Sequence, residues 1–229
     1  LLMNKINSVL LPGSFFTNDY VEKAKKLTSL EIDTIYFYDH TVNPVDKNLE
    51  VYQLIDGLYK LYDIVKNDIS LGVCVLNINS RPHQTLFEDY INKLLDIKNF
   101  KLGIGTGDDK FEKRMNFSNN LVQIINEVKS SKKFESNNTQ LFIGGNSKEK
   151  LNFMKKYDLG INQWMGTKKA FQEKESIYSK IKHPLGRLSI CLNPYNPIIF
   201  KSDLSYEKIF ILKDSNNEIF YKTLDNIFK

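Results

Sequence analysis

Short apolar runs alternate with longer amphipathic stretches along most of the chain. The pattern is clearest between Leu71 and Asp108. Two apolar runs there, Leu71–Leu76 and Phe100–Ile104, are too short for helices and rich in β-branched residues, which predicts buried parallel strands. Apolar residues between them recur at spacings of three and four, which predicts an amphipathic helix over Leu86–Ile97. Strand, helix and strand in about thirty residues form a βαβ unit.

The same pattern predicts six further strands, at Ile6–Leu11, Thr34–Tyr38, Gln140–Ile143, Leu159–Trp164, Leu188–Leu192 and Tyr206–Leu212. Helices are predicted at Asn18–Leu30, Leu49–Val65, Phe111–Lys129, Phe171–Ile181, Glu218–Phe228 and directly after residue 147, with a loop at Lys129–Asn138. Eight strands alternating with helices favour an α/β fold of the closed (β/α)8 TIM-barrel type over an open sheet. We expect one compact domain over residues 1–229. The loops between its late strands are short, because Pro194–Ser205 has too few residues for a full outer helix.

The composition of the chain bears on whether nucleic acid or a membrane is an expected binding partner. The 229 residues carry a net charge of +5, from 32 basic and 27 acidic side chains that are scattered along the chain. Without a basic stripe, nucleic acid is not expected as a ligand. No apolar run approaches the roughly eighteen residues of a transmembrane helix, and Lys5 and Asn7 interrupt the opening apolar residues of what could be a signal peptide. Two cysteines without metal-ligand spacing, Cys74 and Cys191, predict buried free thiols and a cytoplasmic protein.

Candidate chemistry lies at the strand ends, because ligands of parallel α/β folds bind at the carboxyl ends of the strands. Asp39 and His40 close the second strand. A histidine there can act as acid, base or proton shuttle near neutral pH, or it can merely bind loop backbone. After the third strand, Arg81 could hold an anion or a neighbouring loop, and His83 follows it. Trp164 ends the sixth strand and fits either a pocket wall or the core.

Two glycine-containing turns complete the candidates. Residues 105–108 read GTGD, and such glycines let backbone approach a ligand or simply form a tight turn, with Asp108 as a helix cap. Residues 144–147 read GGNS and precede a helix, whose free N–H groups can bind phosphate with added charge from Lys168; a plain turn is the alternative. The spacing fits neither a Walker loop nor the dinucleotide fingerprint.

In their order along the chain, these motifs resemble the bacterial luciferase-like superfamily of flavin and deazaflavin oxidoreductases. The opening SVLLPG…TIYFYDH ends in an Asp-His pair as that family's does, and LGVCVLNINSRPHQT is similar to its third-strand segment. KLGIGTGD resembles its glycine-rich turn, and LFIGGNSKEKLNFMKKYDLGINQWMG its late phosphate loop, helix and strand. The resemblance extends to about Gly166.

The resemblance implies a TIM barrel with a flavin-type ring, F420 or FMN, over the strand ends. It implies that a bulge in the third strand, often with a non-proline cis peptide, backs the ring at Cys74-Val75. His40 matches the family's catalytic histidine, and Asp108 an acidic proton donor. We expect the cofactor to contact Asp39, Cys74, Val75, Asn77, Thr106, Gly107, Gly144, Gly145, Asn146, Ser147 and Lys168.

The chain also departs from the family pattern. It is shorter than usual members and lacks the long insertion that closes many active sites, and the usual proline after the third strand is Ile78. The leading hypothesis is therefore an F420- or FMN-dependent oxidoreductase or monooxygenase acting on a small organic substrate, expected by analogy to be a homodimer. The alternatives are a non-catalytic flavin-binding protein of the same fold and, independently of the resemblance, a barrel that binds a sugar phosphate.

Overall fold

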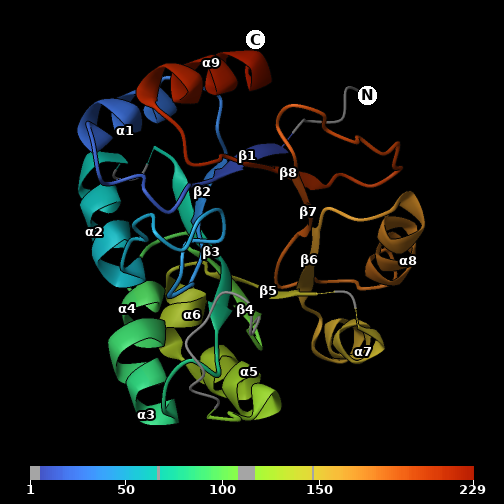
Figure 1. Cartoon of the computed structure of the whole chain (residues 1–229). Helices are drawn as coiled ribbons and strands as arrows, with labels where there is room; N and C mark the ends of the chain where they lie inside the picture. Colours follow the sequence, from blue (N-terminus) through green and yellow to red (C-terminus); the bar gives the residue numbers. More distant parts are fainter. Residues whose placement is uncertain (1–5, 66–67, 108–116, 146) are drawn as a thin grey trace.

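Eight parallel strands form a closed barrel, as the sequence predicts. The computed structural model describes residues 6–65, 68–107, 117–145 and 147–229. Each strand pairs with the next along the chain, and the last pairs with the first, so that the strands form the ring at the centre of Figure 1. The strands are β1 (Ile6–Leu10), β2 (Thr34–Phe37), β3 (Ser70–Asn77), β4 (Lys101–Gly105), β5 (Gln140–Gly144), β6 (Gly160–Trp164), β7 (Leu188–Leu192) and β8 (Glu207–Ile211).

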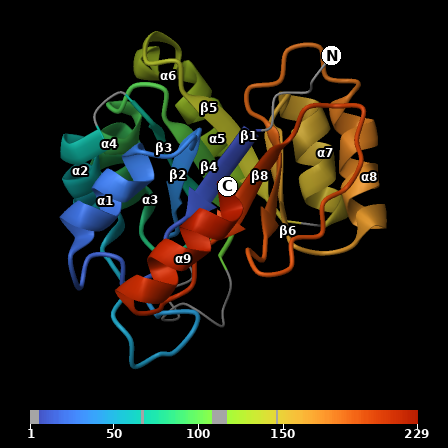
Figure 2. The same ribbon diagram turned by 90° about the horizontal axis from the view of Figure 1, so that it is seen from above.

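Helices surround this ring on the outside (Figures 1 and 2). They are α1 (Tyr20–Thr28), α2 (Leu54–Val65), α3 (His83–Thr85), the π-helical turn η1 (Leu86–Ile91), α4 (Asn92–Leu95), α5 (Leu121–Ser130), α6 (Lys132–Ser136), α7 (Lys148–Tyr157), α8 (Lys168–Tyr178) and α9 (Asn217–Ile227). Side chains at the N-caps of α5, α7, α8 and α9 accept a bond from an N–H three residues on. In the fully described segment 193–206, between β7 and β8, there is no helix, which confirms the predicted short connection.

Two hydrophobic cores result from this arrangement. The larger one fills the space between the barrel and the helices. The smaller one lies inside the barrel and consists of alternate strand residues, Leu10, Tyr36, Tyr38, Cys74, Phe142, Cys191 and Ile209. Side chains alternate between the two faces of a strand, so one face of each strand supplies each core.

A charged network occupies the amino-terminal end of the barrel. Glu207, only 1% exposed, accepts hydrogen bonds from Ser8 Oγ at 2.5 Å and from Tyr36 Oη at 3.1 Å. Lys101 Nζ lies 3.5 Å from the same carboxylate and also pairs with Asp33, which Arg187 contacts at 2.7 Å. Although burial opposes it, the charge of Lys101 and the bonds from Arg187 and Lys101 hold the pKa of Asp33 at about 2. This end of the barrel is closed and its charges are compensated.

Several predicted boundaries are wrong, and the helix predicted at Phe171–Ile181 runs from Lys168 to Tyr178. Residues 129–138 are not a continuous loop, because α6 forms there and buries the ring of Phe134. The helix predicted from Leu49 begins only at Leu54, since the preceding segment turns Tyr52 inward and places its hydroxyl on the N–H of Tyr38 at 3.0 Å. The helix predicted from Phe111 begins at Leu121 within the described part, capped by Asn120; residues 111–116 lie outside the described residues.

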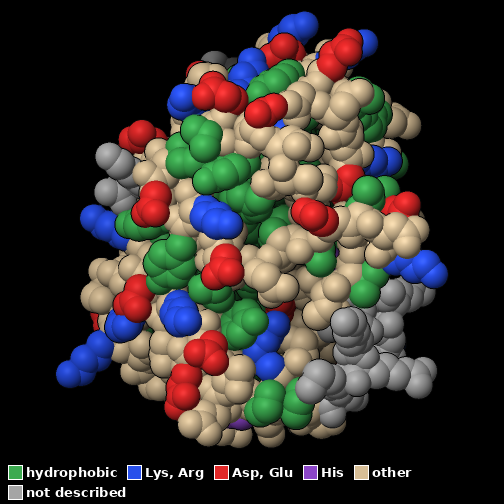
Figure 3. Space-filling model, turned by 60° about the vertical axis from the view of Figure 1, so that its left-hand side comes forward, with side chains coloured by type: hydrophobic (Ala, Val, Ile, Leu, Met, Phe, Trp, Pro, Cys, Tyr) green, Lys and Arg blue, Asp and Glu red, His purple; other side chains and the backbone are tan. Residues whose placement is uncertain are grey.

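Charges on the surface are mixed in sign. On the face shown in Figure 3, basic and acidic side chains are interspersed with apolar ones. None of the helices within the described residues combines the length and the apolar character needed to span a bilayer.

Candidate functional site

A pocket of about 560 Å³ opens at the carboxyl end of the barrel. Residues at or just after the ends of all eight strands line it, and most of its wall is apolar. The predicted site residues in that wall are His40, Cys74, Val75, Asn77, Thr106, Gly107, Gly144 and Gly145. The fold therefore brings together four strand ends that the sequence singled out.

The floor of the pocket contains an irregularity in β3. The peptide bond between Cys74 and Val75 is cis, and the register with β4 shifts between Val73 and Leu76. This is the bulge that the family resemblance implies. The Val75 side chain points across the barrel mouth: a Cβ added at Gly105 would lie 2.5 Å from one of its methyl carbons, and a Cβ added at Gly144 would lie 2.8 Å from the other. Both glycines are needed for close approach, and Val75 forms a small apolar platform.

Aromatic rings hold His40 on one wall. The His40 ring lies 4.9 Å from the ring of Tyr38, which in turn lies 5.2 Å from the ring of Tyr52. Tyr38 is 6% exposed, and its hydroxyl has no hydrogen-bond partner among the residues that the structure describes. Burial, and after it the carboxylate of Asp214, raises the pKa of Tyr38. At neutral pH the hydroxyl of Tyr38 therefore keeps its proton.

Asp39 does not line the pocket. Its carboxylate accepts two bonds from Arg81, at 2.8 and 2.9 Å, and one from the N–H of Asn77 at 3.0 Å. The guanidinium also lies 3.8 Å from the ring centroid of Tyr90. Arg81 thus holds a carboxylate, that of Asp39 in the loop after β2, and the pair ties the chain segments after β2 and β3 together. His83 contacts Glu127 at 3.1 Å and does not line the pocket.

The turn after β4 packs against the loop after β3. Gly107 has φ +91°, and an added Cβ would lie 2.6 Å from the side chain of Asn77. The carbonyl of Thr106 accepts a bond from Asn79 Nδ2 at 3.1 Å. The glycine is therefore needed by the turn, and both Thr106 and Gly107 also face the pocket. Asp108 lies outside the described residues.

The turn after β5 brings an unforeseen lysine to the pocket. Gly145 has φ +123°, and the stem of Lys150 lies over it, 2.7 Å from the position that a Cβ would take. Lys150 lines the pocket, and burial lowers its pKa. Ser147 caps α7 by accepting from the N–H of Lys150 at 3.3 Å, and Asn146 lies outside the described residues. The signal that sequence reasoning missed is the position of Lys150, in the first turn of the helix that follows GGNS.

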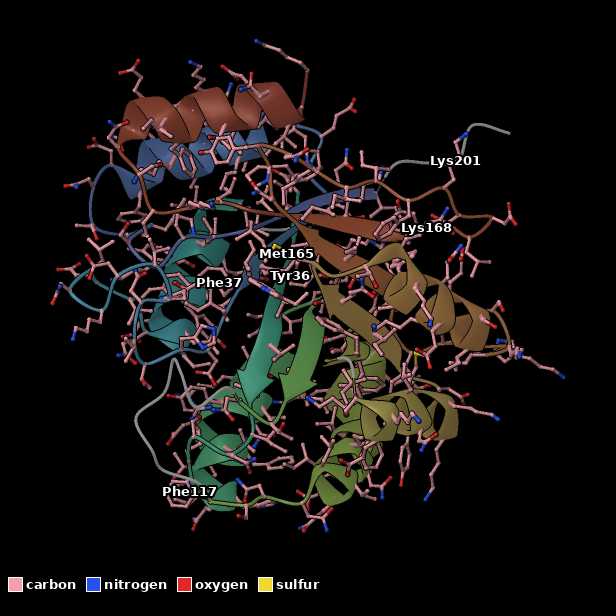
Figure 4. The ribbon with its side chains drawn as sticks, turned by 45° about the vertical axis from the view of Figure 1, so that its right-hand side comes forward. Tyr36, Phe37, Phe117, Met165, Lys168 and Lys201 are labelled. Carbon is pink, nitrogen blue, oxygen red and sulfur yellow. The ribbon has the colours of Figure 1, made fainter. Side chains whose placement is uncertain are left out.

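Lys168, the cation expected beside this loop, is elsewhere. It is exposed at the start of α8, and it is absent from the pocket wall. In Figure 4 Met165 lies near the middle of the ring of strands, whereas Lys168 lies toward its outside. Lys150 is the cation that the described structure brings to the GG turn.

Further residues, most of which the sequence did not single out, form the rim of the pocket. Trp164 does line the pocket, together with Met165 and Val45. Asp214, also in the wall, accepts bonds from Ser14 N at 2.7 Å and Asn43 Nδ2 at 3.0 Å. Asp214 comes from a loop without glycine or histidine, whereas Val45 lies in the loop that follows His40 and Met165 precedes Gly166.

Metal and thiol chemistry find little support in the described residues. They contain no group of three His, Cys, Asp or Glu side chains that could hold a metal ion. Both cysteines are free and buried, as predicted. Hydrogen bonding to Cys191, together with burial, raises the pKa of the Cys74 thiol well above its usual range. Cys74 is therefore a neutral part of the pocket floor.

Several solved structures share this fold, and two of them are enzymes. One is a coenzyme F420-dependent tetrahydromethanopterin reductase from Methanopyrus kandleri, with a TM-score of 0.60. The other is the oxygenating constituent of 3,6-diketocamphane monooxygenase, a type II Baeyer-Villiger monooxygenase from the CAM plasmid of Pseudomonas putida, in complex with FMN, with a TM-score of 0.56. Each is 12% identical over 82% of this chain, and the matches cover 65% and 67% of those chains.

The likeness shows the fold, and the chain spans about two thirds of the length of these two structures. No protein-family model matches the sequence, and no curated protein matches it either.

Proposed function

We propose that the chain is an oxidoreductase that binds FMN or F420 at the barrel mouth and acts on a small organic substrate. The observation that carries the proposal is the mostly apolar pocket, whose floor is the Val75 platform and whose edge is the Gly145–Lys150 turn. Of the two fold neighbours, one is an F420-dependent reductase and the other a monooxygenase in complex with FMN. A sugar phosphate is disfavoured, because its many hydroxyls need more polar groups than this wall offers.

The residues present fit such a cofactor in size and chemistry. A volume of about 560 Å³ lies within the roughly 300–1,000 Å³ of small-molecule sites. Gly105 and Gly144 leave an apolar surface at Val75 against which a flat ring could lie. At the other edge, Lys150 and the N-terminus of α7 suit a phosphate, because a cation and free N–H groups both attract an anion.

When bound, the cofactor would supply hydride or electron transfer at its ring. In the proposal, His40 moves a proton at its ring nitrogen, and Asp39 and Arg81 fix the strand end that carries it. Asp108, outside the described residues, is the second proposed proton donor. Lys150 takes the phosphate role that the sequence assigned to Lys168, while Gly144, Gly145, Asn146 and Ser147 remain the proposed loop.

The test is a titration of the purified protein with FMN and F420, followed by absorbance and fluorescence. Riboflavin, which lacks the phosphate, is the matched ligand. If FMN is the cofactor, we expect it to bind more tightly than riboflavin. Lys150→Ala should then weaken FMN roughly tenfold, since a charge-assisted bond contributes about 1.5–3 kcal/mol, and leave riboflavin unchanged. Lys168→Ala is the matched control and should change neither affinity.

Each outcome is decisive. If neither cofactor binds at high micromolar concentration, the proposal fails for this chain. If FMN binds but Lys168→Ala weakens it and Lys150→Ala does not, the phosphate lies at the edge that the sequence predicted and the assignment to Lys150 fails.

A further inference from the structure

Apolar side chains stand half exposed at the mouth of the pocket. Trp164 is 48% exposed, Met165 42% and Val45 59%, and all three line the pocket. Burying such side chains is favourable by about 25 cal/mol per Å² of apolar surface, so their exposure forgoes stabilisation. Grouped exposed apolar side chains mark a binding surface more often than scattered ones do.

The backbone holds these side chains in place. Met165 has φ +45°, a left-handed conformation that glycine adopts more easily than methionine. Its N–H donates to the carbonyl of Cys191 at 3.0 Å, and its carbonyl accepts from Gln163 Nε2 at 2.7 Å. Hydrogen bonds to both backbone groups of Met165 thus fix the turn. The turn itself does not need a side chain at this position. A ligand in the pocket is a contact that would account for this side chain.

Two of the charged residues that line the pocket, Asp214 and Lys213, contact other groups of the protein. The carboxylate of Asp214 accepts bonds from Ser14 and Asn43. The ammonium of Lys213 lies 5.8 Å from the ring centroid of Tyr195. In the proposed function the ammonium of Lys150 binds the phosphate of the cofactor, so it is assigned to that group and not to the substrate. The surface that remains at Trp164 and Met165 is apolar, and the tryptophan ring gives it a flat, stackable face.

We propose that the substrate site of this pocket takes an uncharged, planar ring system, which stacks on Trp164 and is held at its edge by Met165. The inference rests on the proposed function, because it names the substrate class of the same pocket. An aromatic or fused unsaturated ring matches the surface. A sugar or a charged aliphatic molecule does not, because the apolar face offers no partner for its polar groups.

The experiment compares two ligands of one skeleton by isothermal titration. Coumarin is flat and uncharged, and octahydrocoumarin is its saturated, non-planar counterpart. We expect the protein to bind coumarin about fivefold more tightly, since stacking adds roughly 0.5–1.5 kcal/mol beyond area burial. Trp164→Ala should remove this preference and Trp164→Phe should keep part of it. Met165→Gly should weaken coumarin about threefold without lowering the melting temperature.

Ile219→Ala is the control, because Ile219 is 43% exposed on α9 and does not line the pocket. Equal affinity for the two ligands, or a preference that survives Trp164→Ala, would overturn the inference. The FMN and F420 titrations on the same preparations separate the two claims. If a cofactor binds but coumarin is not preferred, only the proposed ring site is rejected. If coumarin is preferred but neither cofactor binds, the proposed function is rejected and the ring site is retained.

Discussion

The two ends of the barrel are built on opposite principles. At the amino-terminal end, Glu207, Lys101, Asp33 and Arg187 form a network in which each charge has a partner. At the carboxyl end, the wall is apolar, glycines replace side chains and tryptophan stands half exposed. One end is organised to stabilise the barrel, whereas the other leaves surface and volume for a ligand.

Two tyrosines, one in β2 and one directly after it, show the same contrast. Tyr36 and Tyr38 both point into the barrel and belong to the same interior cluster. The hydroxyl of Tyr36 points toward the closed end and donates to Glu207, while that of Tyr38 has no partner within the described residues. The difference teaches that burial alone does not show what a polar group does; its partners do.

The largest expected effect is at the closed end. Glu207→Ala removes the acceptor of two hydrogen bonds and one partner of the buried Lys101 ammonium. We expect unfolding in urea to need about 3–5 kcal/mol less free energy, because a buried charge is left undercompensated. Glu22→Ala is the control: its pair with Lys25 is exposed and should change stability by at most about 0.5 kcal/mol. Similar losses for both variants would contradict the contrast between buried and exposed pairs.

The closed end should also set the acid stability. The folded pKa of Asp33 is about 2 against an ordinary 3.8, so its stabilisation is fully present above pH 4 and is lost as pH falls through 2. The lost free energy is about 2 kcal/mol. In urea titrations at a series of acidic pH values, Asp33→Asn should therefore show a shallower dependence than the wild type. An unchanged slope would mean that Asp33 is not so perturbed.

At the carboxyl end of the barrel, the next prediction concerns the close packing of Gly105 against Val75. Gly105→Ala places a methyl group 2.5 Å from Val75 and should destabilise by about 1–3 kcal/mol. Val75→Ala removes the methyl groups that are in the way, so the double variant should be less destabilised than the sum of the singles. Strict additivity in this cycle would show that the two side chains do not meet.

The smallest expected changes in stability come from removing the hydroxyl groups of Tyr36 and Tyr38. Tyr36→Phe should cost about 1–2 kcal/mol, because it leaves a buried carboxylate with one donor fewer. Tyr38→Phe should be neutral or slightly stabilising in the ligand-free protein, since the lost hydroxyl has no partner among the described residues. Equilibrium unfolding of both variants side by side measures the difference. Equal losses would mean that Tyr38 makes a hydrogen bond that the structure does not contain.

The sequence predicted the barrel well because the barrel depends on periodicity. Each strand is a short apolar run, and α5 buries Leu121, Ile124, Ile125 and Val128 at the spacings of one helix face. Helix starts were less predictable, because a tertiary contact decides them. Tyr52 leaves the helical pattern in order to reach the backbone of Tyr38. Such a contact joins segments whose separation no local pattern encodes.

The site was partly predictable for the same reason. Strand-end residues such as His40 and Gly144 can be placed once the strands are known. The side-chain partners cannot: nothing in the sequence pairs Asp39 with Arg81, or puts Lys150 rather than Lys168 beside Gly145. Trp164 was ambiguous because an aromatic residue at a strand end suits the core and a pocket equally well.

Trp164 has one more consequence, since it is the chain's sole tryptophan. The intrinsic indole emission of the protein therefore arises entirely at the pocket mouth, and none of it comes from the charged network at the other end. Emission wavelength will report solvent access to the mouth, while far-ultraviolet circular dichroism reports the barrel as a whole. If the pocket mouth becomes solvent-accessible at a lower temperature than the barrel unfolds, the emission of Trp164 will change before the circular dichroism does. No added label is needed to detect this difference.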